Sequence, residues 1–422
     1  MDTIVLSEKI AVSTDMAKTH LNNNICIVGC TGSGKTTSFI EPRLLKTFDT
    51  NLIIYDPKRE LIEKYRGMFE ERGNNVWEIN LSSPQDSDVA YDPIKDIKSD
   101  EDIIHLSDAL VNLIPQRDNS SADKFWEKGA AALNQMGIYY KISTKEDCTF
   151  ADVLDFLCDE LTIEDGSASI RTSIDQQIEM IKKNHPGHPV ITPYNSLKIL
   201  PIKTAGCVFS ELRTTLTNVF TRGMKEAIRN KPALDIQRFA SEKSVLFITA
   251  SSSNNYLDAI VNLIFNTCLK QLQEIAQKSV TKQLPIPVHL IMDDFACGSI
   301  IKSFPKDISR FRSFLISVTI VLQSRAQLEG MYGICDATTI TDNCDTTLFL
   351  GSLNKETCKY YAEMINVPLE KVLYMPLGNV IVIRRGSPPS IDKRYPTLED
   401  KEYKRIAELN RKRRNDLIHA IR

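Results

Sequence analysis

Short apolar stretches rich in β-branched residues recur along the chain, and each is bounded by residues that favour turns. Most of them are continuous rather than alternating, which is typical of strands that helices cover on both faces. This pattern predicts a largely parallel sheet. The predicted strands are residues 25–28, 52–55, 76–79, 245–249, 288–292, 318–322, 347–350 and 380–383.

Helical patterns separate these apolar runs. Residues 60–72 and 256–278 are clear examples, and the second has apolar residues three and four positions apart. Strands that alternate with helices in this way predict an α/β fold with a doubly wound, mostly parallel sheet.

The middle of the chain breaks this alternation. Between Asp100 and Ser241 no strand pattern appears, whereas residues 125–140 and 208–227 have helical patterns. We therefore expect an inserted all-α domain at 100–241, between two parts of one α/β domain at 1–99 and 242–400. A basic helical tail at 401–422 follows, and it is either a solvated helix or a contact for phosphates or an acidic partner.

The charge balance gives no general sign of nucleic-acid binding. The 422 residues contain 52 Lys and Arg against 54 Asp and Glu, a net charge of −2, so any site for a polyanion must be local. No apolar run reaches the roughly 18 residues of a membrane span, and the N-terminus lacks the pattern of a signal peptide. The sequence predicts a folded cytoplasmic protein, which includes a peripheral position at the cytoplasmic face of the cell membrane.

A phosphate-binding loop follows the first predicted strand of the sheet. Gly29-Cys-Thr-Gly-Ser-Gly-Lys-Thr36 satisfies G-x-x-x-x-G-K-[ST] between a strand and a helix, the context that this motif requires. Its main-chain N–H groups and the helix dipole would bind the phosphates of ATP. Lys35 would neutralise the β and γ phosphates, and the Thr36 hydroxyl would ligate Mg²⁺. The predicted nucleotide-binding residues are Gly29, Cys30, Thr31, Gly32, Ser33, Gly34, Lys35, Thr36 and Thr37.

Two acidic residues end the predicted strand at 288–292. We expect Asp293 to hold Mg²⁺ and Asp294 to activate the attacking water. An acidic strand end that caps the next helix is the alternative.

Polar residues also flank the predicted strand at 318–322. If this strand neighbours the acidic one, Gln323 would lie beside the acid pair, where its amide can bond both the γ phosphate and the attacking water. An ordinary polar residue at a strand end is the alternative. Arg310, Arg312 and Arg325 flank the same strand, and any of them could serve as an arginine finger for a neighbouring subunit or remain an ordinary surface residue.

Ordered motifs along most of the chain resemble the coupling-protein ATPases of type IV secretion and conjugation, the VirD4/TraG group. Asp56-Pro-Lys-Arg-Glu-Leu61 is similar to the family's D-P-K-G-E-L, and Asp293-Asp-Phe-Ala296 to its D-E-F-A. Further matches are Phe125-Trp-Glu-Lys128, Leu322-Gln-Ser-Arg-Ala-Gln-Leu328, Tyr332-Gly333, Asn343-Cys-Asp345, Leu350-Gly351 and Glu356-Thr357.

The resemblance implies more than the residues alone. It implies a RecA-like P-loop motor domain with an inserted all-α domain, a ring-shaped homo-hexamer, and ATP hydrolysis between subunits. It also implies a channel for single-stranded DNA with an attached relaxase, recruitment of substrates by the all-α domain, and type IV secretion channel components at the inner membrane as partners. Arg312 falls where the family carries the first arginine of its R-S-R-G segment, so it becomes the finger candidate.

Three departures from the family pattern stand out. The usual N-terminal membrane-spanning pair is absent, which fits a trimmed chain, a natural soluble form or one that recruits its membrane partner. Asp294 replaces Glu and has a shorter reach by roughly one carbon–carbon bond, more than 1 Å. Arg59 replaces a glycine.

Three functions remain open from the sequence. The leading hypothesis is an ATP-driven coupling protein that recruits and translocates single-stranded DNA with its relaxase into a conjugation channel. The first alternative is a nucleotide-gated recruitment platform for protein effectors with little net ATP turnover, which Asp294 favours. The second is a soluble helicase or packaging motor.

Overall fold

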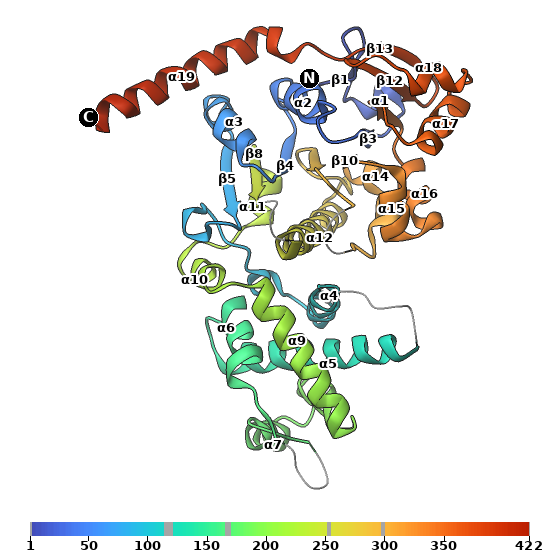
Figure 1. Ribbon diagram of the computed structural model, residues 1–422. Helices are drawn as coiled ribbons and strands as arrows, with labels where there is room; N and C mark the ends of the chain where they lie inside the picture. Colours follow the sequence, from blue (N-terminus) through green and yellow to red (C-terminus); the bar gives the residue numbers. More distant parts are fainter. Residues whose placement is uncertain (1, 114–120, 165–169, 251–254, 297–299, 422) are drawn as a thin grey trace.

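A nine-stranded sheet forms the centre of the molecule in the computed structural model (Figure 1), which describes residues 2–113, 121–164, 170–250, 255–296 and 300–421. The strand order within these residues is β13-β12-β11-β3-β10-β9-β4-β8-β5. Strands β11 to β5 in this order run parallel, and β12 and β13 are antiparallel additions at one edge. The strands are β3 (Ile25–Val28), β4 (Asn51–Asp56), β5 (Asn75–Asn80), β8 (Ser244–Thr249), β9 (Val288–Met292), β10 (Ile316–Leu322), β11 (Thr346–Phe349), β12 (Asn379–Arg384) and β13 (Ser390–Lys393).

Every strand predicted from a continuous apolar run is present in this sheet. The structure also has strands that were not predicted: β13, the small pair β1 (Thr3–Val5) and β2 (Ala11–Ser13), and a second small pair in the inserted segment. Strand β13 reads Ser-Ile-Asp-Lys and lies at the sheet edge, where only part of each side chain is buried. An edge strand therefore lacks the apolar signal that identifies the central ones.

Both faces of the sheet are covered, which explains the continuous apolar runs. Ile25 and Ile27 of β3 join the core that contains η1 (Thr36–Ile40), α2 (Glu41–Leu45) and α3 (Glu60–Glu71). Cys26 and Val28 join the core on the other face, which contains α12 (Asn255–Lys278). The remaining helices of this layered part are α1 (Met16–Thr19), α13 (Phe304–Asp307), α14 (Phe311–Phe314), α15 (Arg325–Tyr332), α16 (Ile334–Asp342), α17 (Lys355–Met364) and α18 (Leu369–Leu373).

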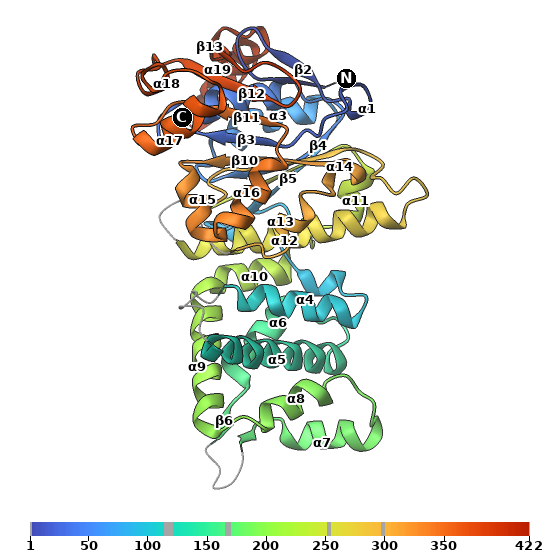
Figure 2. The same ribbon diagram turned by 90° about the vertical axis from the view of Figure 1, so that its right-hand side faces the viewer.

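The inserted segment forms a separate helical lobe, which Figure 2 shows stacked below α12. It contains α4 (Asp100–Val111), α5 (Ser121–Thr144), α6 (Phe150–Asp155), η4 (Phe156–Glu160), α7 (Asp175–Asn184), α8 (Ile191–Lys198), α9 (Ile202–Val219) and α10 (Arg222–Asn230). The lobe also contains one short antiparallel strand pair, β6 (Ile163–Glu164) and β7 (Arg171–Thr172), with two residues in each strand. The insertion is mostly helical, as expected, but this small strand pair means that it is not purely all-α. Its boundaries stay a prediction.

The single helix expected at 208–227 was wrong. The structure breaks it after Val219: Phe220 is extended, and Thr221 caps the new helix α10 by accepting a hydrogen bond from the Met224 amide. A Thr side chain at this position satisfies an N–H group that would otherwise lack a partner at the start of a helix. Apolar spacing continued across the break and hid it.

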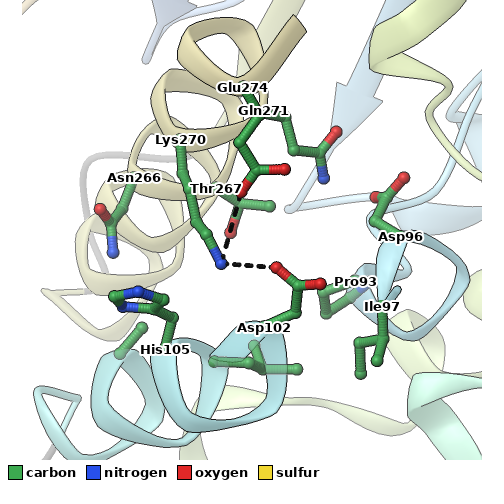
Figure 3. Close-up of a pocket in the computed structure, with 12 residues that line it drawn as sticks. Pro93, Asp96, Ile97, Asp102, His105, Asn266, Thr267, Lys270, Gln271 and Glu274 are labelled. Atoms are coloured by element: carbon green, nitrogen blue, oxygen red, sulfur yellow. Dashed lines mark hydrogen bonds and ion pairs between the residues drawn. The ribbon is translucent and has the colours of Figure 1, made fainter. Parts of the chain in front are cut away.

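Several contacts join the helical lobe to the sheet layer, among them a backbone pairing after β5 and the packing of α4 and α9 on α12. Ala90, after β5, pairs with Ala233, which precedes α11 (Ile236–Ser241). Helix α4 lies against α12, where Lys270 bonds Asp102 at 2.8 Å and lies 3.7 Å from Glu274 (Figure 3). Burial opposes ionisation of Asp102, but hydrogen bonds from Lys270, Lys98 and Ser99 hold its pKa at about 2. The ion pair between Lys270 and Asp102 therefore links the lobe to the sheet layer.

The C-terminal helix α19 (Lys401–Ile421) crosses α3 and then extends beyond the sheet (Figure 1). Ile406 is buried, Arg405 pairs with Glu71, and Asn410 bonds the Lys64 carbonyl. The first half of the expected tail is thus packed rather than free. None of the described helices has both the length and the apolar composition needed to cross a bilayer.

Candidate nucleotide-binding site

The loop between β3 and η1 has the backbone of a phosphate cradle. Gly32 and Gly34 have φ of +75° and +78°, a region that side chains disfavour. A Cβ at Gly29 would lie 2.6 Å from Ser33 Oγ and 2.9 Å from Leu350 Cβ, so only glycine fits there. The loop from Gly29 to Thr36 therefore curls tightly at the carboxyl edge of the sheet, just before a helix begins.

Lys35 folds over this loop. Its Nζ donates to the carbonyls of Gly29 at 2.7 Å and Cys30 at 3.3 Å. A carbonyl oxygen is neutral, whereas a phosphate oxygen carries negative charge and attracts an ammonium more strongly. The lysine is thus placed beside the cradle, where it can exchange two carbonyls for a phosphate.

The two acids at the end of β9 face the same edge of the sheet as the loop. Strand β10 pairs with both β3 and β9 in parallel, so all three carboxyl ends lie together. The pKa of Asp293 is raised to about 6, first by burial and then by the charge of Asp294, whereas Lys35 and Lys58 act in the opposite direction. Lys35 is close enough to Asp293 for its charge to oppose this rise, so the loop and the acid are neighbours.

Gln323 joins the acid pair directly. Its Nε2 donates to Oδ1 of Asp294 at 3.2 Å, because β10 lies between the loop strand and the acid strand. Asp294 itself has a φ of +48°, an uncommon conformation for a residue with a side chain. Backbone strain of this kind is concentrated at functional sites.

Three further groups reach this edge that the sequence did not single out as site residues. Lys58, in the D-P-K segment, acts on Asp293 as described above. Tyr55 donates its hydroxyl to Asp258 at 2.8 Å, and the pKa of Asp258 is raised by burial and by the charge of Asp294. The D-P-K motif was a usable signal for Lys58, whereas no local pattern marks Asp258 as part of an acidic cluster.

The candidate arginine finger lies away from these groups. Arg312 is in α14, immediately before β10 begins, so it occupies the opposite edge of the sheet from the loop. Its Nη2 donates to the Met16 carbonyl at 3.5 Å, and it lines an open groove of about 720 Å³. It therefore lies on the far side of the sheet from the phosphate loop of its own chain.

The other two arginines are engaged locally. Arg310 pairs with Asp307, and Arg325 pairs with Glu329 at 2.7 Å while lying 4.2 Å above the Tyr360 ring. Of these three arginines, Arg312 therefore has the weakest intramolecular contact, a single 3.5 Å hydrogen bond to a carbonyl.

The residues at this site fit a nucleoside triphosphate bound together with Mg²⁺. The cradle supplies main-chain amides and Lys35 for the phosphates, and Thr36 and Asp293 supply the hydroxyl and carboxylate oxygens that Mg²⁺ prefers. Mg²⁺ usually takes one or two protein oxygens and completes its shell with phosphate oxygens and water. A hard cation shared between the nucleotide and these two side chains matches that rule.

Comparisons with known proteins decide the family. The model of the type IV secretory system conjugative DNA transfer family matches residues 6–365. The chain belongs to this family. The resemblance to coupling-protein ATPases noted in the sequence is thereby confirmed, whereas a search of curated proteins gave no match.

Solved structures agree with the fold of this family member. The unbound conjugative coupling protein TrwBdeltaN70 has a TM-score of 0.67 at 12% identity, over 92% of this chain and 89% of the other. TrwB in complex with ADP and Mg²⁺ has 0.64 at 13% identity, over 88% and 85%. VirB4 of Thermoanaerobacter pseudethanolicus has 0.56 at 14% identity, over 93% and 96%. The prediction of a RecA-like P-loop fold with a helical insertion is confirmed.

Proposed function

We propose that this chain is an ATP-hydrolysing coupling protein that recruits single-stranded DNA with its relaxase and translocates it into a type IV secretion channel. The main support is that the phosphate loop, Asp293 and the hydrogen-bonded pair Gln323–Asp294 lie together at one edge of the sheet. The solved structure of TrwB in complex with ADP and Mg²⁺ supports ATP and Mg²⁺ as cofactors. Family membership supports the role in conjugative DNA transfer.

Each residue has a defined task in this reaction. Loop amides and Lys35 bind the phosphates, and Thr36 with Asp293 would hold Mg²⁺, which supplies charge neutralisation at the β and γ phosphates. Asp294 accepts the proton of the attacking water, and the Gln323 amide orients that water. The position of Arg312 supports completion of the site by a neighbouring copy. A homo-hexameric ring at the cytoplasmic face of the membrane is proposed from family membership.

The test is ATP turnover per chain as a function of protein concentration, with and without single-stranded DNA. Catalysis between subunits predicts that turnover per chain rises as copies assemble and that DNA raises it further. DNA binding should weaken steeply with salt, because Lys and Arg contacts to phosphates release counterions. Turnover per chain that is independent of concentration and of DNA would contradict the proposal, and Lys35→Ala is the matched inactive control.

A recruitment platform with little turnover is the second candidate, and Asp294 favours it. The short carboxylate is held by Gln323, so it reaches a water less easily than Glu would. Asp294→Glu separates the two functions. A wild-type chain that binds ATP but hydrolyses it negligibly, and that gains turnover in Asp294→Glu, supports the platform; clear wild-type turnover supports the motor.

A further inference from the structure

A segment near the C-terminus holds the phosphate loop from behind. Arg394 follows β13, and because β13 is antiparallel to β12, it ends at the carboxyl edge of the parallel strands, beside the loop. Its guanidinium donates to three main-chain carbonyls: that of Ser33 in the loop, that of Leu350 at 3.1 Å and that of Asn379 at 3.0 Å. One side chain thus ties the loop to the ends of two neighbouring strands.

The bond to Ser33 fixes a peptide that the nucleotide needs. A peptide unit is planar and trans, so its C=O and the following N–H point in opposite directions. Because Arg394 holds the Ser33 carbonyl, the Gly34 N–H points away from the guanidinium. A Cβ at Gly34 would lie only 3.2 Å from Arg394 Nη1, so the guanidinium packs directly on this peptide.

A second contact continues the same hold along the helix that follows. Thr397 Oγ1 donates to the Thr37 carbonyl at 2.5 Å, and Asp400 accepts from Lys46 at 2.7 Å. Thr37 lies at the start of η1, and Lys46 at the end of α2. Residues 394–400, which we call the C-terminal strap, therefore follow the phosphate-loop helix from end to end.

The chemistry of Arg394 is specific to an arginine. Burial lowers the pKa of Arg394. Its partners are neutral main-chain carbonyls, so the guanidinium fixes backbone groups rather than pairing with an acid. A guanidinium presents several N–H donors in one rigid plane, whereas lysine offers a flexible point charge. Three carbonyls from three different segments cannot be held in the same geometry by an ammonium.

We infer that Arg394 is a positioning residue for a nucleoside di- or triphosphate, which presets the Gly34 N–H to receive a phosphate oxygen, with Thr397 as a second tie. The inference rests on the proposed nucleotide binding and adds a residue outside 6–365, the part of the chain that the family model matches. The C-terminal strap therefore contributes to the site without belonging to its motif.

The test compares Arg394→Ala and Arg394→Lys with Arg385→Ala in the full chain. Arg385 directly follows β12, at the opposite edge of the sheet from the loop, and it pairs with Asp345. Arg385→Ala is therefore a control for general loss of stability. The probes are Mg·ADP and Mg·ATP, measured by calorimetric titration and by steady-state turnover. Removing hydrogen bonds that orient a donor to a charged ligand should raise the Kd for both nucleotides about tenfold.

The expected pattern separates positioning from folding. Arg394→Ala and Arg394→Lys should both raise Kd and KM about tenfold with kcat little changed, because the loop binds ground and transition states alike. Thr397→Ala should raise them about threefold, since it removes a single neutral tie. Arg385→Ala should leave Kd unchanged whatever it does to the melting temperature.

Failure of the inference differs from failure of the proposed function. If the wild type binds Mg·ATP and Lys35→Ala does not, but the Arg394 variants bind normally, the inference is overturned while the nucleotide site stands. A loss of kcat at constant KM would indicate a smaller folded fraction and would overturn it too. If Arg394→Ala fails to fold, Arg394→Lys and Thr397→Ala decide by the same readouts. A wild type that binds neither nucleotide ends both proposals.

Discussion

Arg59 and Glu78 form a two-pronged ion pair, with Nε 2.7 Å from Oε1 and Nη2 3.0 Å from Oε2. The Glu78 side chain is 2% exposed and also accepts from the Thr249 hydroxyl at 2.9 Å. Arg59 has a φ of +60°, the left-handed region where the resembling family carries glycine. The pair offsets a conformational cost of about 1–2 kcal/mol, which accounts for an arginine in a glycine position.

Replacing Arg59 tests this balance. Arg59→Ala should destabilise the chain by about 1–2 kcal/mol, because it leaves Glu78 buried without its main partner. The partial exposure of Arg59 limits this loss of stability. Arg59→Gly should be less destabilised than Arg59→Ala by about 1 kcal/mol, since glycine adopts this φ freely. Urea unfolding ranks the variants, and an Arg59→Gly chain no more stable than Arg59→Ala would contradict the explanation.

The sequence predicted the central sheet and the meeting of the site residues because both follow from local patterns. Continuous apolar runs mark buried parallel strands, and carboxyl ends of such strands share one edge, so Gln323 and Asp294 could be expected together. Arg394 and Ser33 are 361 positions apart, and the edge strand that brings them together has no apolar run. The break at Thr221 was detectable as a helix cap, but the apolar spacing outweighed it.

Gln323→Ala should separate binding from chemistry. The side chain donates to Asp294, which acts on the attacking water in the proposed mechanism rather than on the bound phosphates, so the Kd for Mg·ATP should stay within about twofold of wild type. Turnover should fall about 100-fold, because a positioned water and its base are lost together. Single-turnover hydrolysis and nucleotide titration measure the two effects. Arg405→Ala, which removes a surface pair between the C-terminal helix and Glu71, is the control that should keep turnover. Weaker ATP binding by Gln323→Ala would argue for another role.

Asp56 gives the stability a pH dependence of known sign. It is buried and accepts hydrogen bonds from the amides of Leu61 and Ile62, at 2.8 and 2.9 Å. Burial raises its pKa to about 6, although these amides oppose the rise. A carboxyl with a raised pKa favours the folded state below its unfolded pKa, and this contribution is lost as the pH rises through about 6.

Asp56→Asn isolates this contribution. The amide oxygen can still accept from both N–H groups but does not titrate. The stability of the wild type relative to Asp56→Asn should therefore fall by up to about 3 kcal/mol between pH 4 and pH 7. Chemical unfolding of both chains at each pH gives the difference, in which the opposing effects of carboxyls such as Asp102 and Asp400 cancel. A difference that is flat with pH would show that Asp56 is not protonated in the folded chain.

Arg312 lies at the edge of the sheet opposite its own phosphate loop, which makes a mixing experiment decisive. Lys35→Ala lacks a working loop but keeps its finger, and Arg312→Ala lacks the finger but keeps its loop. Each variant alone should be inactive, whereas an equal mixture should recover about a quarter of the wild-type turnover, because that share of random head-to-tail contacts joins an intact loop to an intact finger. Nucleotide binding by Arg312→Ala should remain normal, since the finger acts on developing charge in the transition state. If the mixture stays inactive while Arg312→Ala binds ATP and assembles, the finger is not shared between copies; full turnover by Arg312→Ala alone would move the role to Arg310 or Arg325.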